Sequence, residues 1–355
     1  MDQDITRALQ DQVEEAFRHR RGLEIRGGNS KIFLSGRKSE HLVPLEVSGH
    51  SGIIKYEPRE LVMTARAGTT LSELEGTLAE SGQMLPFEPP HFGTGATLGG
   101  TIACNLSGPR RAYFGAARDF VLGTKIINGK GEVLRFGGEV MKNVAGYDVS
   151  RLMAGARGTL GVLLEISIKV LPRAAAAATI VQTCGPEQAL NKMNTWAGRA
   201  YPVTATCYSD DKLYLRLEGA RSSVDSAVRQ LGGDLFRSGD TFWRDVREHR
   251  HEFFNGNHTL WRLSVKSTAP LFDAAGLWMF EWSGAQRWIT GALNAAKLRE
   301  YAAAWGGHAV QYRHADPSVD VFHPLTKGLR LIHERLKLAF DPERIFNPDC
   351  FYPGL

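Results

Sequence analysis

Glycine is concentrated in one stretch of this chain, between residues 93 and 161. Fifteen of the 38 glycines lie in these 69 residues, which is about three times the usual glycine content of roughly 7%. Glycine is unfavourable inside regular helices and strands, so this density predicts tight turns or backbone packed closely against another group. Short β-like apolar runs lie between the glycines, and we therefore expect strands joined by glycine-rich turns.

The totals describe an ordinary globular protein. Its 355 residues suggest two domains at about 150 residues each, and 43% hydrophobic with 23% charged residues is typical of a packed core. The net charge is +5 and its basic residues form no run, which argues against nucleic-acid binding. An anionic cofactor or substrate is enough to explain so small an excess.

The four cysteines are scattered, with no CxxC pair and no histidine at ligand spacing. This argues against a zinc site or an iron–sulfur cluster in this chain and fits a reducing compartment. The N-terminus lacks the apolar core of a signal peptide, and no run of about 18 apolar residues could span a membrane. We therefore expect a cytoplasmic protein.

Apolar spacing predicts the elements of the first half. A four-residue spacing indicates a helix over 4–21, and a strand at 22–26 follows it. Thr70 and Glu73 form a capping-box pattern that predicts a helix over 70–81. Further strands are expected at 61–67, 120–127, 133–136 and 162–171, the second and third of these joined by a hairpin turn at 128–131.

The pattern of predicted elements changes after Pro172, which indicates a domain boundary. Strands and helices are predicted in the order strand 179–183, helix 186–197, strands 203–208 and 212–217, and helix 220–231, which is typical of a ferredoxin-like module. A looser set follows, with a strand at 260–265, strands within 276–289, a helix at 293–304 and a strand at 308–313. The spacing of Leu325, Leu329, Ile332, Leu336 and Ala339 then predicts an amphipathic helix.

Three segments are candidates for ligand binding. The first, Arg26-Gly27-Gly28-Asn29-Ser30-Lys31, follows a strand, and its glycines allow successive N–H groups to point into one concavity that suits a pyrophosphate. Taken alone, this segment fits a plain strand-end turn better than a binding loop. It is neither a GxGxxG element nor a GxxxxGK[ST] loop, which argues against a nicotinamide Rossmann site or a P-loop.

The second segment runs from Gly93 to Gly108. Its small residues would allow a large flat ligand to lie against the main chain, and its hydroxyl and amide groups could bind the polar edge of that ligand. A flexible linker is excluded because Leu98, Ile102 and Leu106 recur every fourth residue and require burial. The third segment, Gly155–Val162, enters a strand through a glycine-rich turn. Such turns are common, so its interpretation as a binding segment depends on its order and spacing relative to the other two.

Together these motifs carry a resemblance. The order RGGNS, TGATLGGTIACNLSGP, YFGAARD (113–119) and KNVAGYDVSRLMAGARGTLG (142–161) resembles the FAD domain of the vanillyl-alcohol oxidase/p-cresol methylhydroxylase (PCMH) superfamily. Within it, the chain is most similar to the FAD-binding E subunits of bacterial glycolate oxidases (glycolate dehydrogenases). The resemblance implies an α+β fold: a PCMH-type FAD-binding domain at 1–172, a ferredoxin-like cap domain at 173–335, and a C-terminal segment at 336–355 that returns to the FAD domain.

The resemblance also implies roles for residues. Backbone groups at 27–31 would hold the FAD pyrophosphate, residues 93–108 would flank the ribityl chain and the isoalloxazine ring, Arg118 and Asp119 would brace the loop near the flavin, and Gly161 and Val162 would contact the adenine. The full set of expected FAD-binding residues is Arg26, Gly27, Gly28, Asn29, Ser30, Lys31, Gly93, Thr97, Leu98, Gly99, Gly100, Thr101, Asn105, Ser107, Arg118, Asp119, Gly158, Gly161 and Val162. A Gly28→Asp change should lose FAD because its carboxylate would face the pyrophosphate.

Two departures from the superfamily pattern shape the functional hypothesis. Asn29 stands where some members carry a histidine that binds flavin covalently, so we predict a non-covalent FAD. The His-rich metal motif of the related 2-hydroxy-acid dehydrogenases has no counterpart: His308 and His314 are too far apart along a strand to share a metal, and His249 and His251 are expected to be solvated surface residues. No metal site and no catalytic residue is therefore assigned.

Three functions remain open. In the first, the chain is an FAD-binding, electron-relaying subunit of a glycolate-oxidising complex with a second FAD subunit and an iron–sulfur subunit. This complex would lie in the cytoplasm or, through these partners, at the inner face of the membrane. In the second, it oxidises a small 2-hydroxy acid alone. In the third, it binds a partner without flavin, which the intact glycine segments argue against. We expect the tryptophans at 278, 282 and 288 to lie in the core and not on a docking face.

Overall fold

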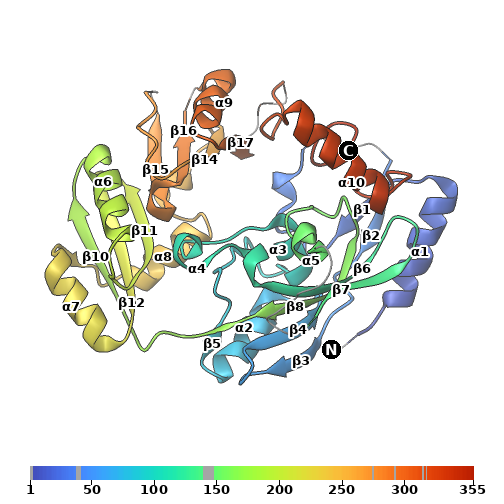
Figure 1. Cartoon of the computed structure of the whole chain (residues 1–355), viewed down its shortest axis with the longest axis horizontal. Helices are drawn as coiled ribbons and strands as arrows, with labels where there is room; N and C mark the ends of the chain where they lie inside the picture. The colour runs from blue at the N-terminus through green and yellow to red at the C-terminus, as the bar shows by residue number, and fades with distance from the viewer. Residues whose placement is uncertain are drawn as a thin grey trace. The chain divides into compact units, whose positions relative to one another are not determined.

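The computed structural model describes residues 3–36, 41–138, 148–273, 276–291, 293–313, 316 and 318–355. Its chain forms two compact units (Figure 1). Unit 1 comprises Met1–Leu106, Ala116–Pro172 and Pro324–Leu355, and unit 2 comprises Ser107–Gly115 and Arg173–His323. The grouping differs from the expected division at two places, because 107–115 belongs to unit 2 and the return to unit 1 begins at 324 rather than 336.

Unit 1 is built on a five-stranded sheet whose strands come from distant parts of the chain. Its order is β3-β4-β8-β6-β7, and every neighbouring pair is antiparallel. Smaller sheets pair β1 with β2 and β5 with β9. The strands are β1 Leu23–Arg26, β2 Val43–Glu46, β3 Ile53–Glu57, β4 Val62–Arg66, β5 Gln83–Met84, β6 Val121–Ile127, β7 Val133–Gly137, β8 Val162–Lys169 and β9 Leu171–Pro172.

Helix α2 of unit 1 shows how local sequence sets where a helix begins and which side is buried. Thr70 caps α2 by accepting a hydrogen bond from the Glu73 amide at 3.2 Å, as its capping pattern predicts. Leu71, Leu74 and Leu78 of α2 are fully buried, so its apolar stripe faces the core. The helical segments are α1 Thr6–His19, η1 Ile32–Leu34, α2 Leu71–Glu80, α3 Leu98–Cys104, η2 Ala117–Phe120, α5 Val149–Met153 and α10 Lys327–Phe340.

Unit 2 carries an eight-stranded sheet that repeats one topology twice. Its order is β13-β10-β12-β11-β15-β16-β14-β17. The first four strands follow the chain pattern 4-1-3-2 and the last four the pattern 2-3-1-4, which is the same arrangement in reverse. All neighbouring pairs are antiparallel, and β11 joins β15 at the centre. The predicted ferredoxin-like fold is thus confirmed, and the looser second set of elements is a second module of the same kind.

The elements of unit 2 match most of the predicted ranges. They are α4 Arg111–Phe114, β10 Ala176–Thr183, α6 Pro186–Ala197, β11 Val203–Ser209, β12 Lys212–Gly219, α7 Arg221–Leu231, β13 Asp234–Leu235, α8 Gly239–Arg247, η3 Glu252–Phe254, β14 Leu260–Ser264, β15 Leu277–Glu281, η4 Trp282–Gly284, β16 Gln286–Thr290, α9 Ala295–Ala304 and β17 His308–Arg313. Trp282 and Trp288 are buried and Trp278 packs against the core. The core position expected for these tryptophans is therefore confirmed.

The C-terminal tail runs beside the first strand of unit 1. Leu23 donates its amide to the Ile345 carbonyl at 2.6 Å, and Asn347 donates its amide to the Leu23 carbonyl at 2.9 Å. In Figure 1 this red segment lies next to the blue N-terminal elements. Within the described residues, no helix has the length and apolar character needed to cross a bilayer.

Candidate functional site

The loop at residues 27–31 leaves β1 and presents a row of unpaired amides. β1 ends at Arg26, whose carbonyl accepts a hydrogen bond from the Val47 amide at 2.7 Å. The chain then turns through Asn29, whose φ is 53°. In the part of the chain that the structure describes, the amides of Gly27–Ser30 donate to no protein acceptor. Successive N–H groups of this kind can bind an anion.

Packing alone requires a glycine at position 28. A Cβ at this position would lie 1.4 Å from the Gly95 carbonyl oxygen, so the two glycine-rich segments touch backbone to backbone. The structure therefore adds a steric reason to the charge repulsion expected for Gly28→Asp, because the new side chain would meet Gly95 and distort the loop.

The second glycine-rich segment contains a short helix, where sequence reasoning expected a loop. Thr97 begins α3 by accepting the Gly100 amide on Oγ1 at 3.2 Å. The amides of Leu98 and Gly99 donate to the carbonyls of Thr69 and Ala67 at 2.9 and 2.8 Å. These hydrogen bonds occupy the first amides of α3, so α3 contributes its glycine surface to the site and not its N–H groups.

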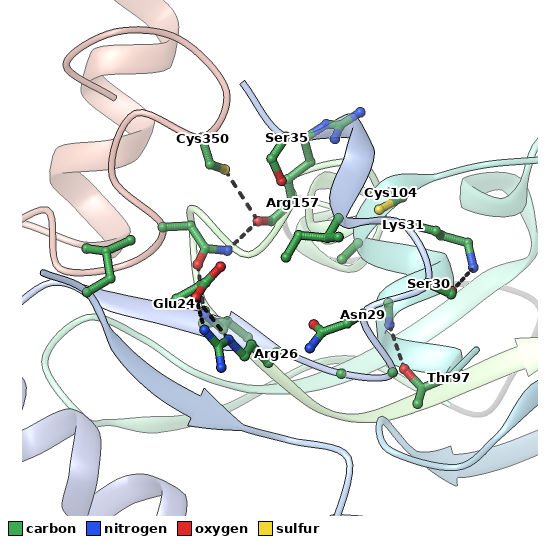
Figure 2. Close-up of a pocket in the computed structure, with 18 of the residues that line it drawn as sticks. Glu24, Arg26, Asn29, Ser30, Lys31, Ser35, Thr97, Cys104, Arg157 and Cys350 are labelled. Atoms are coloured by element: carbon green, nitrogen blue, oxygen red, sulfur yellow. Dashed lines mark hydrogen bonds and ion pairs between the residues drawn. The ribbon is translucent and has the colours of Figure 1, made fainter. Parts of the chain in front are cut away.

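An open cavity with about 890 Å³ of empty volume lies over these segments and is called here the outer cavity. Figure 2 shows the 27–31 loop, Thr97, Arg157 and Cys350 around it. The predicted residues that line it are Arg26, Gly27, Gly28, Asn29, Ser30, Lys31, Thr97 and Gly100.

A second, smaller cavity adjoins the first and is called the inner cavity. It has about 440 Å³ of empty volume and shares Gly27, Thr97 and Gly100 with the outer cavity. Gly99, Gly158 and Gly161 line it together with apolar Val47, Ala67 and Leu163. Small and apolar walls of this kind suit a flat ring. The structure thus brings all three predicted segments together at two adjoining cavities.

The two cations of the first segment differ in their partners. Arg26 is held by Glu24 at 2.5 Å and by Glu46 at 3.5 Å, and its hydrogen bond to Glu24 raises the pKa of the guanidinium. Lys31 is buried and its Nζ donates to the Ser30 hydroxyl at 3.2 Å and the His91 carbonyl at 3.3 Å. Of these two cations, Lys31 is therefore the one placed directly beside the loop.

Four residues that line both cavities were not among the expected FAD-binding residues: Ile25, Ala103, Arg157 and Asn347. The Asn347 side chain accepts the Ile25 amide at 2.8 Å and donates to the Arg157 carbonyl at 2.8 Å. It thereby ties the tail to β1 and to the third segment. Asn347 is 322 positions from Ile25, and no local sequence pattern links the two.

Two cysteines also line the outer cavity, Cys104 and Cys350. Burial raises the pKa of the Cys350 thiol to about 11, which disfavours the thiolate. The Cys350 thiol is therefore a poor nucleophile.

Several predicted residues have other positions. Leu98, Thr101 and Val162 are fully buried in α3 and β8, Asn105 ends α3 and accepts the Arg118 amide at 3.0 Å, and Asp119 accepts the Ala116 amide at 2.9 Å. Gly93 is exposed, and Ser107 belongs to unit 2. The Arg118 side chain lines a different cavity of unit 1, beside α10. None of these residues lines the outer or inner cavity formed by the described residues.

The histidines of unit 2 correct one expectation. His249 is not a solvated surface residue, since its ring stacks on Phe254 at 4.1 Å and lies edge-on to Trp288 at 4.8 Å. Burial, together with nearby Arg313 and Arg262, lowers its pKa well below 6.5. His251 is half-buried and packs edge-on against Phe242 at 5.5 Å. His314 lies outside the described residues, and among those described no group of three metal-ligating side chains is present.

Comparisons with known proteins agree with this geometry. Residues 6–137 match the family described as FAD binding domain, so FAD is the cofactor. The outer cavity fits it, because unpaired amides and Lys31 suit its pyrophosphate. The residues contributed by Arg157–Gly161 and Asn347 lie beyond the matched range.

Relatives and solved structures extend the comparison. The chain is 45% identical to the glycolate oxidase subunit GlcE of Escherichia coli (strain K12), over 99% of both chains. It is 31% identical to the glycolate oxidase subunit GlcD of Bacillus subtilis (strain 168), over 36% of this chain and 27% of that one. It is 31% identical to a D-lactate dehydrogenase of Anaerostipes hadrus, over 37% of this chain and 27% of that one. A solved alkyldihydroxyacetonephosphate synthase shares the fold, with a TM-score of 0.67 at 16% identity, over 96% of this chain and 75% of that one.

Proposed function

Because the chain belongs to the family of the glycolate oxidase subunit GlcE, we propose that it is the FAD-binding subunit of a multi-subunit glycolate oxidase. The complex oxidises glycolate to glyoxylate and passes electrons through flavin to an iron–sulfur subunit, beside a second FAD subunit. One observation carries this proposal: 45% identity over 99% of both chains. We expect the complex in the cytoplasm, with any contact to the inner face of the membrane made through its partners.

The lining of the outer and inner cavities supports the binding of FAD there. The amides of Gly27–Ser30 would donate hydrogen bonds to the pyrophosphate oxygens, and Lys31 would add a positive charge beside them. The small walls at Gly99, Gly158 and Gly161 leave room for a flat ring. When bound, FAD supplies an acceptor for two electrons. Asn29 has no ring nitrogen to bond to flavin, so the cofactor is held without a covalent link.

Flavin reduction under anaerobic conditions tests this proposal. Glycolate is added to the isolated, FAD-loaded chain and to the complex assembled with its other subunits, and the visible flavin bands are followed. The relay role requires bleaching of this chain's flavin only in the complex. Bleaching in the isolated chain would instead establish a stand-alone oxidoreductase of a 2-hydroxy acid.

A second measurement tests the cofactor itself. Acid precipitation of the purified holoprotein should release all flavin into the supernatant. Flavin that stays with the polypeptide would contradict the non-covalent assignment, and a purified chain that never takes up FAD would contradict the whole proposal.

A further inference from the structure

One face of the second module of unit 2 carries basic side chains. β14 and β17 are antiparallel neighbours (Figure 1), with Arg262 opposite Val310 and Ser264 opposite His308. Residues that lie opposite each other in a sheet share a face, and so do residues two apart along a strand. Arg262 and His308 are therefore diagonal neighbours on one face, about 7–8 Å apart and within reach of an arginine side chain.

The opposite face of these two strands belongs to the hydrophobic core of the module. The buried residues of that core come from both strands and from α9, and they include Trp261, Leu263, Leu298, Ala302 and Ala309. Arg262 and His308 therefore point away from α9. His308 is exposed and Arg262 is half-buried, so a small molecule in solution can reach the face that carries them.

Two further basic side chains adjoin this pair. His323 Nδ1 accepts the Ala309 amide at 3.3 Å, which places its ring beside β17 and leaves the proton of the neutral ring on Nε2. The Arg111 guanidinium lies 4.4 Å from the centre of the Trp282 ring, and its charge acts on His308. Four residues of unit 2 thus form what is called here the basic cluster: Arg111, Arg262, His308 and His323.

The basic cluster places positive charge where water is partly excluded. Desolvation is the largest cause that lowers the pKa of His308 to about 4, and the other three members of the cluster lower it further. The ring of His249 packs against the same face, beside Tyr312 at 5.2 Å, and burial with the charges of Arg313 and Arg262 lowers its pKa as well. Among the described residues, every titratable group that acts on these two rings through its charge is basic. Like charges that are brought together and desolvated are unfavourable unless an anion offsets them.

We propose that the basic cluster binds one small oxyanion, the carboxylate or phosphate group of a small molecule. The guanidinium groups of Arg111 and Arg262 have N–H groups that fit the paired oxygens of such an anion. The rings of His308 and His323 each add one N–H donor. The cluster occupies one end of two strands, and this extent suits a single anionic group more than an extended polyanion such as nucleic acid.

This site is separate from the proposed FAD site. Its residues all belong to unit 2, whereas the residues that line the outer and inner cavities belong to unit 1. The basic cluster can therefore bind an anion whether or not the proposed function holds.

Titration of the FAD-loaded chain with acetate, oxalate and inorganic phosphate tests the site. Bound FAD keeps these anions from the amides of the 27–31 loop, and none of the three carries an alcohol that flavin could oxidise. Calorimetry at low ionic strength, where charges are least screened, should show one site with a Kd of about 1 mM or lower for at least one of them. Binding of acetate or oxalate would assign the site to small organic acids, and binding of phosphate alone would assign it to free or esterified phosphate.

Variants of the cluster test whether the anion binds there. His308→Glu should weaken binding by at least about tenfold and leave the unfolding temperature unchanged or higher, because the new carboxylate takes the place of the anion among the cations. Arg262→Gln should weaken binding to a similar extent, whereas Arg262→Lys should retain more of it. The matched control is Arg229→Gln, which changes an exposed arginine on α7 of the same unit and should bind as tightly as the wild type.

The outcomes separate this site from the proposed function. A wild-type chain that binds none of the three anions would overturn the site, and so would wild-type affinity in both His308→Glu and Arg262→Gln. Equal weakening in Arg229→Gln would show a general attraction to basic surface and would also overturn it. A chain that never takes up FAD would contradict the proposed function alone, because the difference in anion affinity between His308→Glu and Arg229→Gln is measured in the same background.

Discussion

The glycines that border this site are glycines for different structural reasons. A Cβ on Gly99 would meet the Ala67 Cβ at 2.7 Å and the Ala67 carbonyl oxygen at 3.0 Å, so Gly99, like Gly28, is small because other protein atoms lie against it. A Cβ on Gly100 would meet only the Thr97 hydroxyl, at 3.2 Å, and Gly100 borders both cavities. Gly100 is therefore the position from which a new side chain can reach the ligand space without disrupting the loops.

A comparison of Gly100→Asp with Gly100→Asn isolates the charge of the bound cofactor. The two side chains have nearly the same shape, but only aspartate places a negative charge near the pyrophosphate. We expect FAD to bind at least tenfold more weakly to Gly100→Asp than to Gly100→Asn, a difference of about 1.4 kcal/mol or more. Titration of the apoproteins with FAD, followed by flavin fluorescence, measures it. Equal affinities would mean that the pyrophosphate lies elsewhere.

Burial of His249 predicts a pH dependence of stability. Its pKa lies well below 6.5 in the folded chain but near 6.5 in the unfolded chain. The unfolded state therefore binds an extra proton as the pH falls below about 6.5. The free energy of unfolding should decrease there by up to about 1.4 kcal/mol per pH unit for this group, down to its folded pKa.

The variant His249→Phe preserves a ring against Phe254 and removes the titration. Urea unfolding of unit 2, followed by tryptophan fluorescence between pH 5 and 8, should show a shallower acid slope in this variant than in the wild type. An unchanged slope would assign the acid sensitivity to other groups, such as His308, whose pKa burial lowers to about 4.

At the scale of elements, periodic segments were predictable and contact-determined ones were not. The helix at 186–197 and the hairpin strands 203–208 and 212–217 follow from local spacing, and the structure has them at nearly the same bounds. α3 was predicted as a loop because its glycines disfavour a helix, yet the carbonyls of Ala67 and Thr69 accept its first amides. The role of Asn347 depended on a fold contact that no local pattern encodes.

The tail is anchored by an ion pair that is almost completely buried. Lys337 and Asp341 lie 2.8 Å apart, and Asp341 also accepts the amides of Ile345 and Phe346 at 3.0 and 2.8 Å. Lys337→Met would leave the Asp341 carboxylate buried without its partner. Removal of one member of such a pair costs about 3–5 kcal/mol.

Urea unfolding of Lys337→Met should show a loss of stability of this size. The control is Arg7→Met, which breaks an exposed pair with Asp11 on α1 of the same unit and should cost about 1 kcal/mol or less. FAD affinity should fall in Lys337→Met as well, because Asn347 follows Asp341 in the same turn and lines both cavities. Equal losses in the two variants would contradict the anchoring role of Lys337.

At the scale of the whole molecule, the two units carry different optical reporters. All seven tryptophans lie between residues 196 and 305, within unit 2, whereas the residues that line the proposed FAD site all belong to unit 1. Tryptophan emission therefore reports unit 2, and release of FAD reports unit 1. The boundary near residue 172 was predictable from composition, but the assignment of 324–335 to unit 1 was not, because it depends on the polar contacts of α10.

This separation predicts that Lys337→Met divides thermal unfolding into two events. Each unit has its own sheet and its own buried side chains, so each can unfold as a cooperative body. A loss of about 3 kcal/mol in unit 1 should lower the temperature of flavin release by roughly 6–12 °C. The tryptophan transition should move by no more than about 2 °C, and His249→Phe at pH 5.5 should shift the tryptophan transition without shifting flavin release. If both signals move together in both variants, the chain unfolds as one cooperative body, and the assignment of separate stabilities to the two units is wrong.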